Sequence, residues 1–260
     1  MPQAASTTKS IARKSEVDPL GLHHGDCLSV LPKLGSAWAD LAYLDPPFAT
    51  GRRQRGRGEA SFEDSWPSIE VWLAFMCERL EATIDALTPT GNLLVHCDWR
   101  TSHHLRVWLD MRLGTACFQN HIVWHYGLGG SSPRRFARKH DDILFYSRSE
   151  SWYFDPPMVR ATSQRMRGEM KKASDVLDIP SLNNMAHERT DWPTQKPLAL
   201  LETLVNACCV PGGVVLDPMC GSGTTLQAAA RTGRRYCGID RSEAALSIAN
   251  QRLQPASSAR

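Results

Sequence analysis

Short apolar runs alternate with stretches of helical periodicity along most of this chain. The runs at 22–26, 41–45, 92–98, 213–217 and 235–240 are typical of buried strands, most of them ending in an acid. The segments interpreted as helices are 27–34, 66–87, 101–113, 197–209, 223–232 and 243–253. Strands that alternate with helices predict an α/β fold with a mainly parallel, doubly wound sheet.

Two further segments break this alternation. The runs 120–126 and 142–146 predict an antiparallel pair of strands joined by a long loop. Residues 147–193 have weak periodicity and many charges, so we expect an irregular lobe inserted for recognition. The chain therefore divides into a disordered tail (1–18), a first half (19–126), a hairpin loop and recognition region (127–193) and a last half (194–260).

Composition narrows the class of protein. The chain has 260 residues, of which 42% are hydrophobic, and this is enough for a sizeable core. No apolar stretch approaches the roughly 20 residues of a membrane span, and no signal-peptide pattern opens the chain. The eight cysteines form no CxxC pair. We expect buried thiols rather than zinc ligands or disulfides, which is typical of a reducing cytoplasm.

Positive charge is clustered although the net charge is only +3. One cluster lies between residues 52 and 57 and a second between 134 and 139, with more basic residues between 160 and 172. These clusters fall in glycine-rich or irregular stretches, which favours a polyanion such as DNA as partner. The candidate DNA-contacting residues are Arg52, Arg53, Arg55, Arg134 and Arg135.

Candidate chemistry is concentrated where predicted strands end. Asp45-Pro46-Pro47-Phe48 follows one apolar strand, and Asp217 closes another just before the glycine loop 220–224. Asp240 closes the next strand, and a carboxylate at roughly this distance can bind ribose hydroxyls. An acid in place of an anion cradle at Asp217 suits a cationic or amino-bearing ligand. The pattern predicts a ligand that contains adenosine.

These motifs, in this order, resemble the beta class of DNA amino-methyltransferases that use S-adenosylmethionine. In that family a (D/N/S)PP(Y/F/W) motif precedes the recognition region, and the cofactor loop comes last. Gly25-Asp26, the Thr194-Gln195-Lys196-Pro197 segment and Gly238-Ile239-Asp240 also match. One departure is Met219, where an aromatic residue is commoner. The resemblance implies a circularly permuted Rossmann-like domain, with the catalytic half at 19–126 and the cofactor-binding half at 194–260. In such a permuted sheet, the strand before Asp26 pairs with the strand that ends at Asp240.

Residue chemistry gives the catalytic motif specific tasks. An exocyclic amine is a poor nucleophile because its lone pair is delocalised into the ring. The Asp45 carboxylate and the Pro46 carbonyl can accept its two N–H bonds, which favours a pyramidal nitrogen. Pro47 fixes the backbone, and Phe48 offers a face for stacking a base that must be flipped out of the duplex.

The resemblance also implies a set of cofactor-binding residues, and no metal. Lys196 is expected to pair with the methionine carboxylate, and Asp240 to bind the ribose. Trp124 is a candidate second aromatic at the flipped base, although an ordinary core tryptophan is an equal reading. The cofactor candidates are Asp26, Thr194, Gln195, Lys196, Pro197, Asp217, Pro218, Met219, Cys220, Gly221, Gly223, Thr224 and Asp240.

Several functions remain open at this level. The sequence favours transfer from S-adenosylmethionine to the N6 amine of adenine in double-stranded DNA, because a serine commonly replaces the first acid in cytosine-N4 enzymes. N4-cytosine methylation, RNA or protein methylation and a catalytically inactive DNA-binding relative are the alternatives. A cytoplasmic, nucleoid-associated protein, a cognate restriction endonuclease and a homodimer are further expectations from the family.

Overall fold

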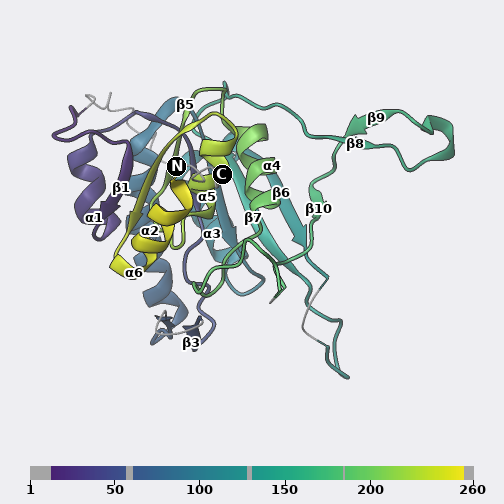
Figure 1. Cartoon of the computed structure of the whole chain (residues 1–260), viewed down its shortest axis with the longest axis horizontal. Coiled ribbons are helices and arrows are strands. Elements are labelled where there is room, and N and C mark those ends of the chain that lie inside the picture. Colours follow the sequence, from purple (N-terminus) through teal and green to yellow (C-terminus); the bar gives the residue numbers. More distant parts are fainter. Residues whose placement is uncertain (1–12, 57–60, 128–130, 184, 255–260) are drawn as a thin grey trace, which may run out of the picture.

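The computed structural model describes residues 13–56, 61–127, 131–183 and 185–254. Its centre is an eight-stranded sheet (Figure 1). The first five strands in spatial order are mutually parallel. They are β1 (Gly21–His24), β12 (Arg235–Asp240), β11 (Val214–Asp217), β2 (Ala39–Leu44) and β5 (Leu87–Cys97).

The sheet continues beyond β5 with a reversed strand. β7 (His140–Ser147) is antiparallel to both β5 and β6 (Phe118–His125), and β10 (Val176–Asp178) adds in parallel to β6. The mainly parallel α/β sheet and its antiparallel strand pair are confirmed. β1 pairs with β12, as expected for a permuted sheet.

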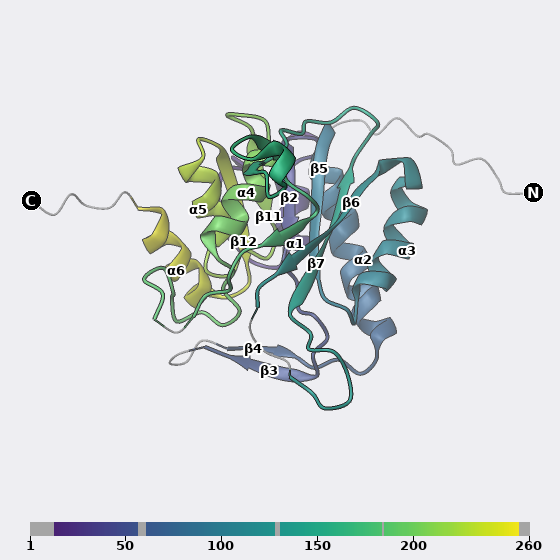
Figure 2. The same cartoon turned by 90° about the vertical axis from the view of Figure 1, so that its right-hand side faces the viewer.

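Helices cover both faces of the sheet (Figure 2). On one face lie α1 (Cys27–Val30), the 3-10 turn η1 (Leu31–Leu34), α2 (Ile69–Ala86) and α3 (Ser102–Leu113), which leads through η2 (Thr115–Cys117) into β6. On the other face lie α4 (Leu198–Cys208) and α5 (Thr224–Arg231), with α6 (Glu243–Leu253) packed beside α5. Side chains alternate along β2 accordingly: Ala42 and Leu44 face α2, whereas Leu41 and Tyr43 face α4.

The longest helix shows how the sequence specifies these layers. The Ser68 side chain caps α2 by accepting a hydrogen bond from the amide of Val71. Trp72, Met76 and Leu80 follow at intervals of four and are fully buried. Each such side chain contributes about 1.5–3 kcal/mol by its burial. The helix predicted over 66–87 therefore forms, but it begins at residue 69.

Two regions contain more structure than the sequence predicts. The arginine-rich stretch after the Asp45 motif is an antiparallel hairpin of β3 (Arg52–Arg55) and β4 (Ser61–Asp64). The lobe expected to be irregular includes β8 (Met158–Arg160), η3 (Gln164–Met166) and β9 (Met170–Lys172), and it also supplies β10. β8 and β9 pair in an arm that projects from the body (Figure 1). Strands β8 and β9 are short and exposed and bury neither face, so their residues show no alternation of apolar and polar positions that would predict a strand.

The predicted disordered tail is partly outside the described residues. Residues 1–12 are not described, and residues 13–18 make hydrogen bonds to the body of the protein. The Arg13 amide donates to the Ser36 hydroxyl (2.9 Å), and the Glu16 amide donates to the Lys33 carbonyl (2.8 Å). These bonds dock the segment against the turn before β2.

The cysteines follow the expectation of buried thiols. All except Cys77 are buried, and Cys77 is half-buried. None of the helices in the described part of the chain combines the length and the hydrophobicity needed to cross a membrane.

Asn92 links strand β5 to the end of helix α4 and to the segment at Tyr153, and its substitution tests this packing. The fully buried side chain donates from Nδ2 to the carbonyls of Cys208 (2.7 Å) and Tyr153 (2.8 Å). Asn92→Ala leaves both carbonyls unpaired, so urea denaturation should show a loss of about 2–3 kcal/mol. Exposed Asn206 bonds to Arg234, and Asn206→Ala should cost less than about 0.5 kcal/mol. Equal losses in the two variants would contradict this role.

Candidate active site

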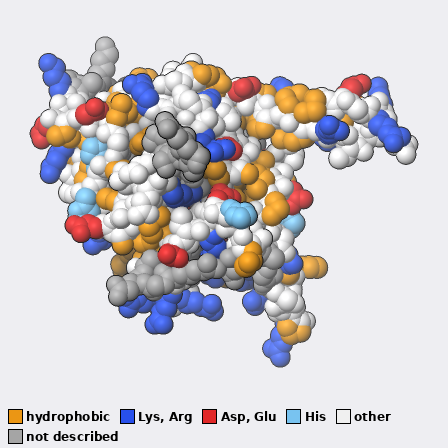
Figure 3. Space-filling view, viewed as in Figure 1, with side chains coloured by type: hydrophobic (Ala, Val, Ile, Leu, Met, Phe, Trp, Pro, Cys, Tyr) orange, Lys and Arg blue, Asp and Glu red, His pale blue; other side chains and the backbone are white. Residues whose placement is uncertain are grey.

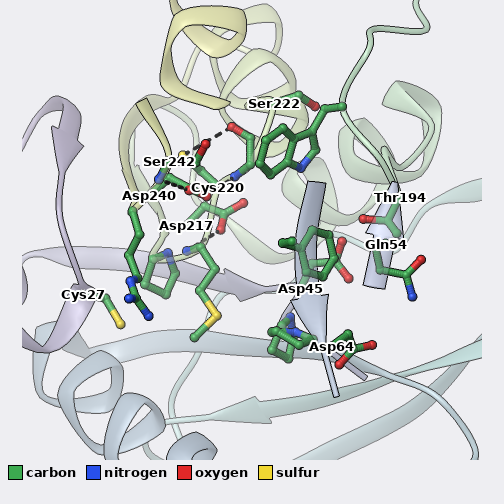
Figure 4. Close-up of a pocket in the computed structure, with 18 of the residues that line it drawn as sticks. Cys27, Asp45, Gln54, Asp64, Thr194, Asp217, Cys220, Ser222, Asp240 and Ser242 are labelled. Atoms are coloured by element: carbon green, nitrogen blue, oxygen red, sulfur yellow. Dashed lines mark hydrogen bonds between the residues drawn. The ribbon is translucent and has the colours of Figure 1, made fainter. Parts of the chain in front are cut away.

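Four carboxylates meet at one edge of the sheet. Because β1, β12, β11 and β2 are adjacent and parallel, the acids at or just beyond their carboxyl ends lie side by side. Figure 4 labels Asp45, Asp217 and Asp240 around a cavity of about 560 Å³, a size suited to a cofactor, and Asp26 also lines this cavity. In spatial order they are Asp26, Asp240, Asp217 and Asp45.

The segment Asp45–Phe48 is held from several sides. The fully buried Trp72 donates from its indole nitrogen to the Pro47 carbonyl (2.7 Å). Phe48 stacks on His96, with the ring centroids 5.6 Å apart and the planes 24° apart. The motif is thus fixed by helix α2 on one side and by strand β5 on the other.

Asp64 fixes the chain just after Phe48. It is buried and accepts hydrogen bonds from the amides of Ala49 (2.9 Å) and Thr50 (3.1 Å) and from the Thr50 hydroxyl (2.6 Å). Ala49 has φ of 54°, a left-handed conformation unusual for a residue with a side chain. These bonds to Asp64 hold the strained turn and join the motif to the β3–β4 hairpin.

A buried polar chain supports the ring of Phe48 from beneath. The Nε2 of His96 donates to Asp141 (3.2 Å), so its Nδ1 accepts from the Tyr43 hydroxyl (2.7 Å). Burial and the nearby carboxylates raise the pKa of Tyr43 well above its usual value, which keeps the hydroxyl protonated as the donor. Trp124 meets His96 edge-on, is only 3% exposed and donates to the Ile179 carbonyl (2.8 Å). Trp124 therefore lies in the core, in keeping with the second of the two interpretations that the sequence allowed.

The glycine loop is tied to Asp240 through its backbone. The two carboxylate oxygens accept from the amides of Gly221 (2.8 Å) and Ser242 (2.8 Å). Gly221 has φ of +51°, and a Cβ there would lie 2.8 Å from the Trp192 indole nitrogen. The loop consequently needs glycine to fit between Asp240 and Trp192.

Asp217 is the most deeply buried of the four strand-end acids. Burial raises its pKa to about 7, and this effect exceeds the opposing hydrogen bonds from Thr225 and the amide of Met219. Burial also raises the pKa of Asp240. Since a nearby positive charge favours the ionised form of each acid, both acids favour a cationic ligand in the cavity.

Asp26 lies at the far side of the cavity and is already paired. It caps α1 through the amide of Leu28 (2.9 Å) and binds Nη2 of the buried Arg79 (2.8 Å). Burial raises its pKa, but the Leu28 amide and Arg79 together outweigh burial and lower it.

The segment 190–196 forms a wall of the cavity that packs against the glycine loop through Trp192. Gln195 braces it, accepting from the Thr190 amide (2.7 Å) and donating to the Glu188 carbonyl (2.7 Å). Lys196 follows and places its ammonium 2.6 Å and 2.5 Å from the two carboxylate oxygens of Asp45. The TQKP segment therefore reaches the Asp45 motif directly.

Most of the predicted site residues line this cavity, but eight do not. The structure brings together Asp26, Asp45, Pro46, Pro47, Phe48, Thr194, Gln195, Lys196, Asp217, Pro218, Met219, Cys220, Gly221, Thr224 and Asp240. Outside its lining lie Trp124, Pro197, Gly223, Arg52, Arg53, Arg55, Arg134 and Arg135. Pro197 begins α4 and Gly223 begins α5, so both shape the site through the backbone. The five arginines are exposed.

Sequence reasoning missed several lining residues. Arg79 carries a readable signal, since it falls on the apolar stripe of α2 between Met76 and Thr83. Phe62 and Trp192 stack 6.4 Å apart at the cavity, joining the β3–β4 hairpin to the segment before Lys196. Because the two rings are 130 positions apart in sequence, no local pattern predicts this contact.

Comparisons with known proteins agree with this geometry. A family model described as DNA methylase, covering N6 and N4 enzymes, matches residues 39–251. The type II methyltransferase M.ScaI of Streptomyces caespitosus is 29% identical over 265 residues, covering 92% of this chain and 83% of the relative. The DNA adenine methyltransferase YhdJ of Escherichia coli (strain K12) is 27% identical over 252 residues, covering 90% and 82%.

A solved structure shows the same fold. The cytosine-N4-specific PvuII DNA methyltransferase superposes with a TM-score of 0.68 and 14% identity, covering 91% of this chain and 86% of that chain. At that identity the likeness concerns the fold alone.

The raised pKa of Asp217 predicts a pH-dependent stability. The native state holds this proton up to about pH 7, whereas an unfolded aspartate loses it near pH 4. Stability from this group is complete below pH 4 and is lost as the pH rises through 7. At pH 8 the native state pays for a buried, ionised carboxylate, and Asp217→Asn removes that cost. The variant should therefore stabilise the ligand-free protein by about 2–4 kcal/mol at pH 8 and by almost nothing near pH 4.

Thermal unfolding between pH 4 and 8 measures the difference. Asp155→Asn, at a position without such burial, is the control and should show no comparable trend. If the stability difference between Asp217→Asn and wild type were the same at every pH, the Asp217 carboxyl could not be buried and protonated as described.

Proposed function

This chain belongs to the N6/N4 DNA methylase family, and we propose that it methylates the N6 amine of adenine in a specific duplex sequence. Like its family, it is a site-specific DNA methyltransferase that uses S-adenosylmethionine. One observation supports the proposal most: Asp45-Pro46-Pro47-Phe48 lies beside the acid-lined cofactor cavity at the same sheet edge.

The cavity residues fit the cofactor. The raised pKa of buried Asp217 suits a cationic group, and the close approach at Gly221 suits a ligand held against the backbone. We propose that Asp217 faces the amino group of its amino acid end, that Asp240 accepts from the ribose hydroxyls, and that Asp26 faces the cofactor from the far side of Asp240. S-adenosylmethionine supplies an electrophilic methyl group carried on a sulfonium.

The catalytic motif orients the amine. The Pro47 carbonyl is already bonded to Trp72, which leaves the Pro46 carbonyl and the Asp45 carboxylate as acceptors for two N–H bonds. Fixed acceptors lower the cost of reorganisation and align the nitrogen lone pair for transfer. Burial raises the pKa of Cys220, so its thiol stays protonated and is a poor nucleophile. We therefore propose direct transfer without a covalent enzyme intermediate.

The base stacks on Phe48. One face of this ring is covered by His96, which is itself fixed by Tyr43 and Asp141. A rigid aromatic face at the bottom of a cavity requires a nucleotide extruded from the helix.

Basic side chains surround this edge and we propose that they bind phosphates. The β3–β4 hairpin lines the cavity with Gln54 and Phe62 and carries the exposed Arg52, Arg53 and Arg55. Figure 3 shows Lys and Arg gathered in this part of the surface and at the end of the projecting arm. Arg138 lies 3.4 Å over the ring of Trp99, which docks the loop of Arg134 and Arg135 near the carboxyl end of β5.

Adenine is favoured over cytosine by Asp45 and by the adenine-specific relative YhdJ. N4-cytosine methylation remains the second candidate, because the N4-specific PvuII enzyme shares this fold. A partner restriction endonuclease is part of the same proposal, since the relative M.ScaI is a type II methyltransferase. A homodimer and a cytoplasmic location are proposed only from the family resemblance.

The decisive experiment is detection of modified bases in DNA from a host that expresses the protein. Sequencing should find N6-methyladenine at one recurring sequence, and N4-methylcytosine there would establish the second candidate. Asp45→Ala should bind S-adenosylhomocysteine at least as tightly as wild type while its transfer rate falls at least 100-fold, the order of loss for a missing transition-state acceptor. Substantial transfer by this variant would refute the role of Asp45.

Replacing Arg134 and Arg135 together tests the proposed phosphate contacts. Binding of duplex DNA by the double alanine variant should weaken about tenfold at physiological salt, and the salt slope should decrease by about two. The matched control replaces Arg112 and Arg231, which lie at the carboxyl ends of α3 and α5 and so at the opposite edge of the sheet. A control pair that changes the slope equally would contradict a local DNA surface.

A further inference from the structure

The Lys196 ammonium occupies the place that the substrate amine must take. Its Nζ contacts both carboxylate oxygens of Asp45, at 2.6 Å and 2.5 Å. It also lies over the Phe48 ring, 5.1 Å from the centroid. The acceptor of the amine and the stacking face of the base are therefore both engaged by one side chain.

This ion pair is sheltered and its backbone is anchored. The side chains of Lys196 and Asp45 are 9% and 21% exposed. The segment before Lys196 is held by Gln195, and the next helix is attached by the Leu198 amide, which donates to the Glu188 carboxylate (3.1 Å). The flexible part is thus the four-carbon lysine side chain, which can change partner without movement of the fold.

The ion pair opposes the methyl transfer that we propose. An amine that gains a methyl group becomes positively charged, and a second positive charge on Asp45 repels it at short range. Lys196 must therefore leave Asp45 before transfer. The anion that enters the same cavity with the cofactor is its carboxylate, and Lys196 lines that cavity.

We propose that Lys196 is a positioning residue that exchanges partners, from Asp45 in the free enzyme to the cofactor carboxylate. The exchange opens the amine site only when the methyl donor is bound, so base entry follows cofactor binding. By linkage, the base and the cofactor then strengthen each other's binding by the same factor. This inference rests on the proposed function and adds an order of binding to it.

A binding experiment without DNA tests the exchange. If Asp45 competes with the cofactor carboxylate for Lys196, Asp45→Asn should tighten S-adenosylhomocysteine binding about tenfold, within the usual range of coupling between sites. In a Lys196→Met background the same change should alter affinity less than twofold. Isothermal titration of the four proteins gives the coupling, and any effect of Asp45 on Asp217 appears in both backgrounds and cancels.

Two controls isolate the carboxylate. Methylthioadenosine lacks the amino acid end, and its affinity should not respond to Asp45→Asn. Lys196→Arg keeps a cation and should retain at least part of the coupling. If Lys196→Met does not fold, the contrast between the two ligands in Asp45→Asn alone still decides the proposal.

Equal tightening in both lysine backgrounds, or an equal response of methylthioadenosine, would overturn the exchange. An enzyme that methylates DNA in its host yet shows no coupling would refute this inference alone. A wild-type protein that fails to bind S-adenosylhomocysteine would instead refute the proposed function.

Discussion

Repulsion among carboxylates at the ends of adjacent parallel strands is the constraint around which this protein is organised. Parallel pairing brings the acids to one edge, and each is compensated by a different means. Asp26 has the Arg79 guanidinium, and Asp240 has the backbone amides of Gly221 and Ser242. The glycine loop and helix α2 are thus held in place by the same charges that create the site.

The other two acids, Asp45 and Asp217, are compensated by groups that can leave. Asp45 holds a lysine ammonium, and Asp217 retains a proton near neutral pH because burial raises its pKa. Asp26 and Asp240, at one end of the row, therefore have fixed partners. Asp217 and Asp45, at the other end, have partners that can exchange. The exchangeable half lies where the methyl donor and the amine are expected to meet, between β11 and β2.

The sequence predicts what depends on local pattern and on order along the chain. Strand ends at Asp45, Asp217 and Asp240 were readable because apolar runs and acids mark them, whereas the pairing of β1 with β12 was expected only from the resemblance to a permuted family. What was missed depends on contacts between distant segments, such as Phe62 with Trp192. The core placement of Trp124 was not decidable, because an aromatic at a strand end suits a ligand or a core equally. The partner of Lys196 was also beyond reach, since which of several anions it meets is set by the folded backbone.

The pairing of β1 with β12 also affects how the chain folds during its synthesis on the ribosome. Among the described strands β1 is made first and β12 last, so β1 stays without its partner through most of the synthesis of the sheet. The cavity draws on residues that follow both of these strands, so it cannot close until β12 has been synthesised. Contacts of such long sequence separation slow folding. A growing chain is therefore unable to form this cavity before β12 has emerged and paired with β1.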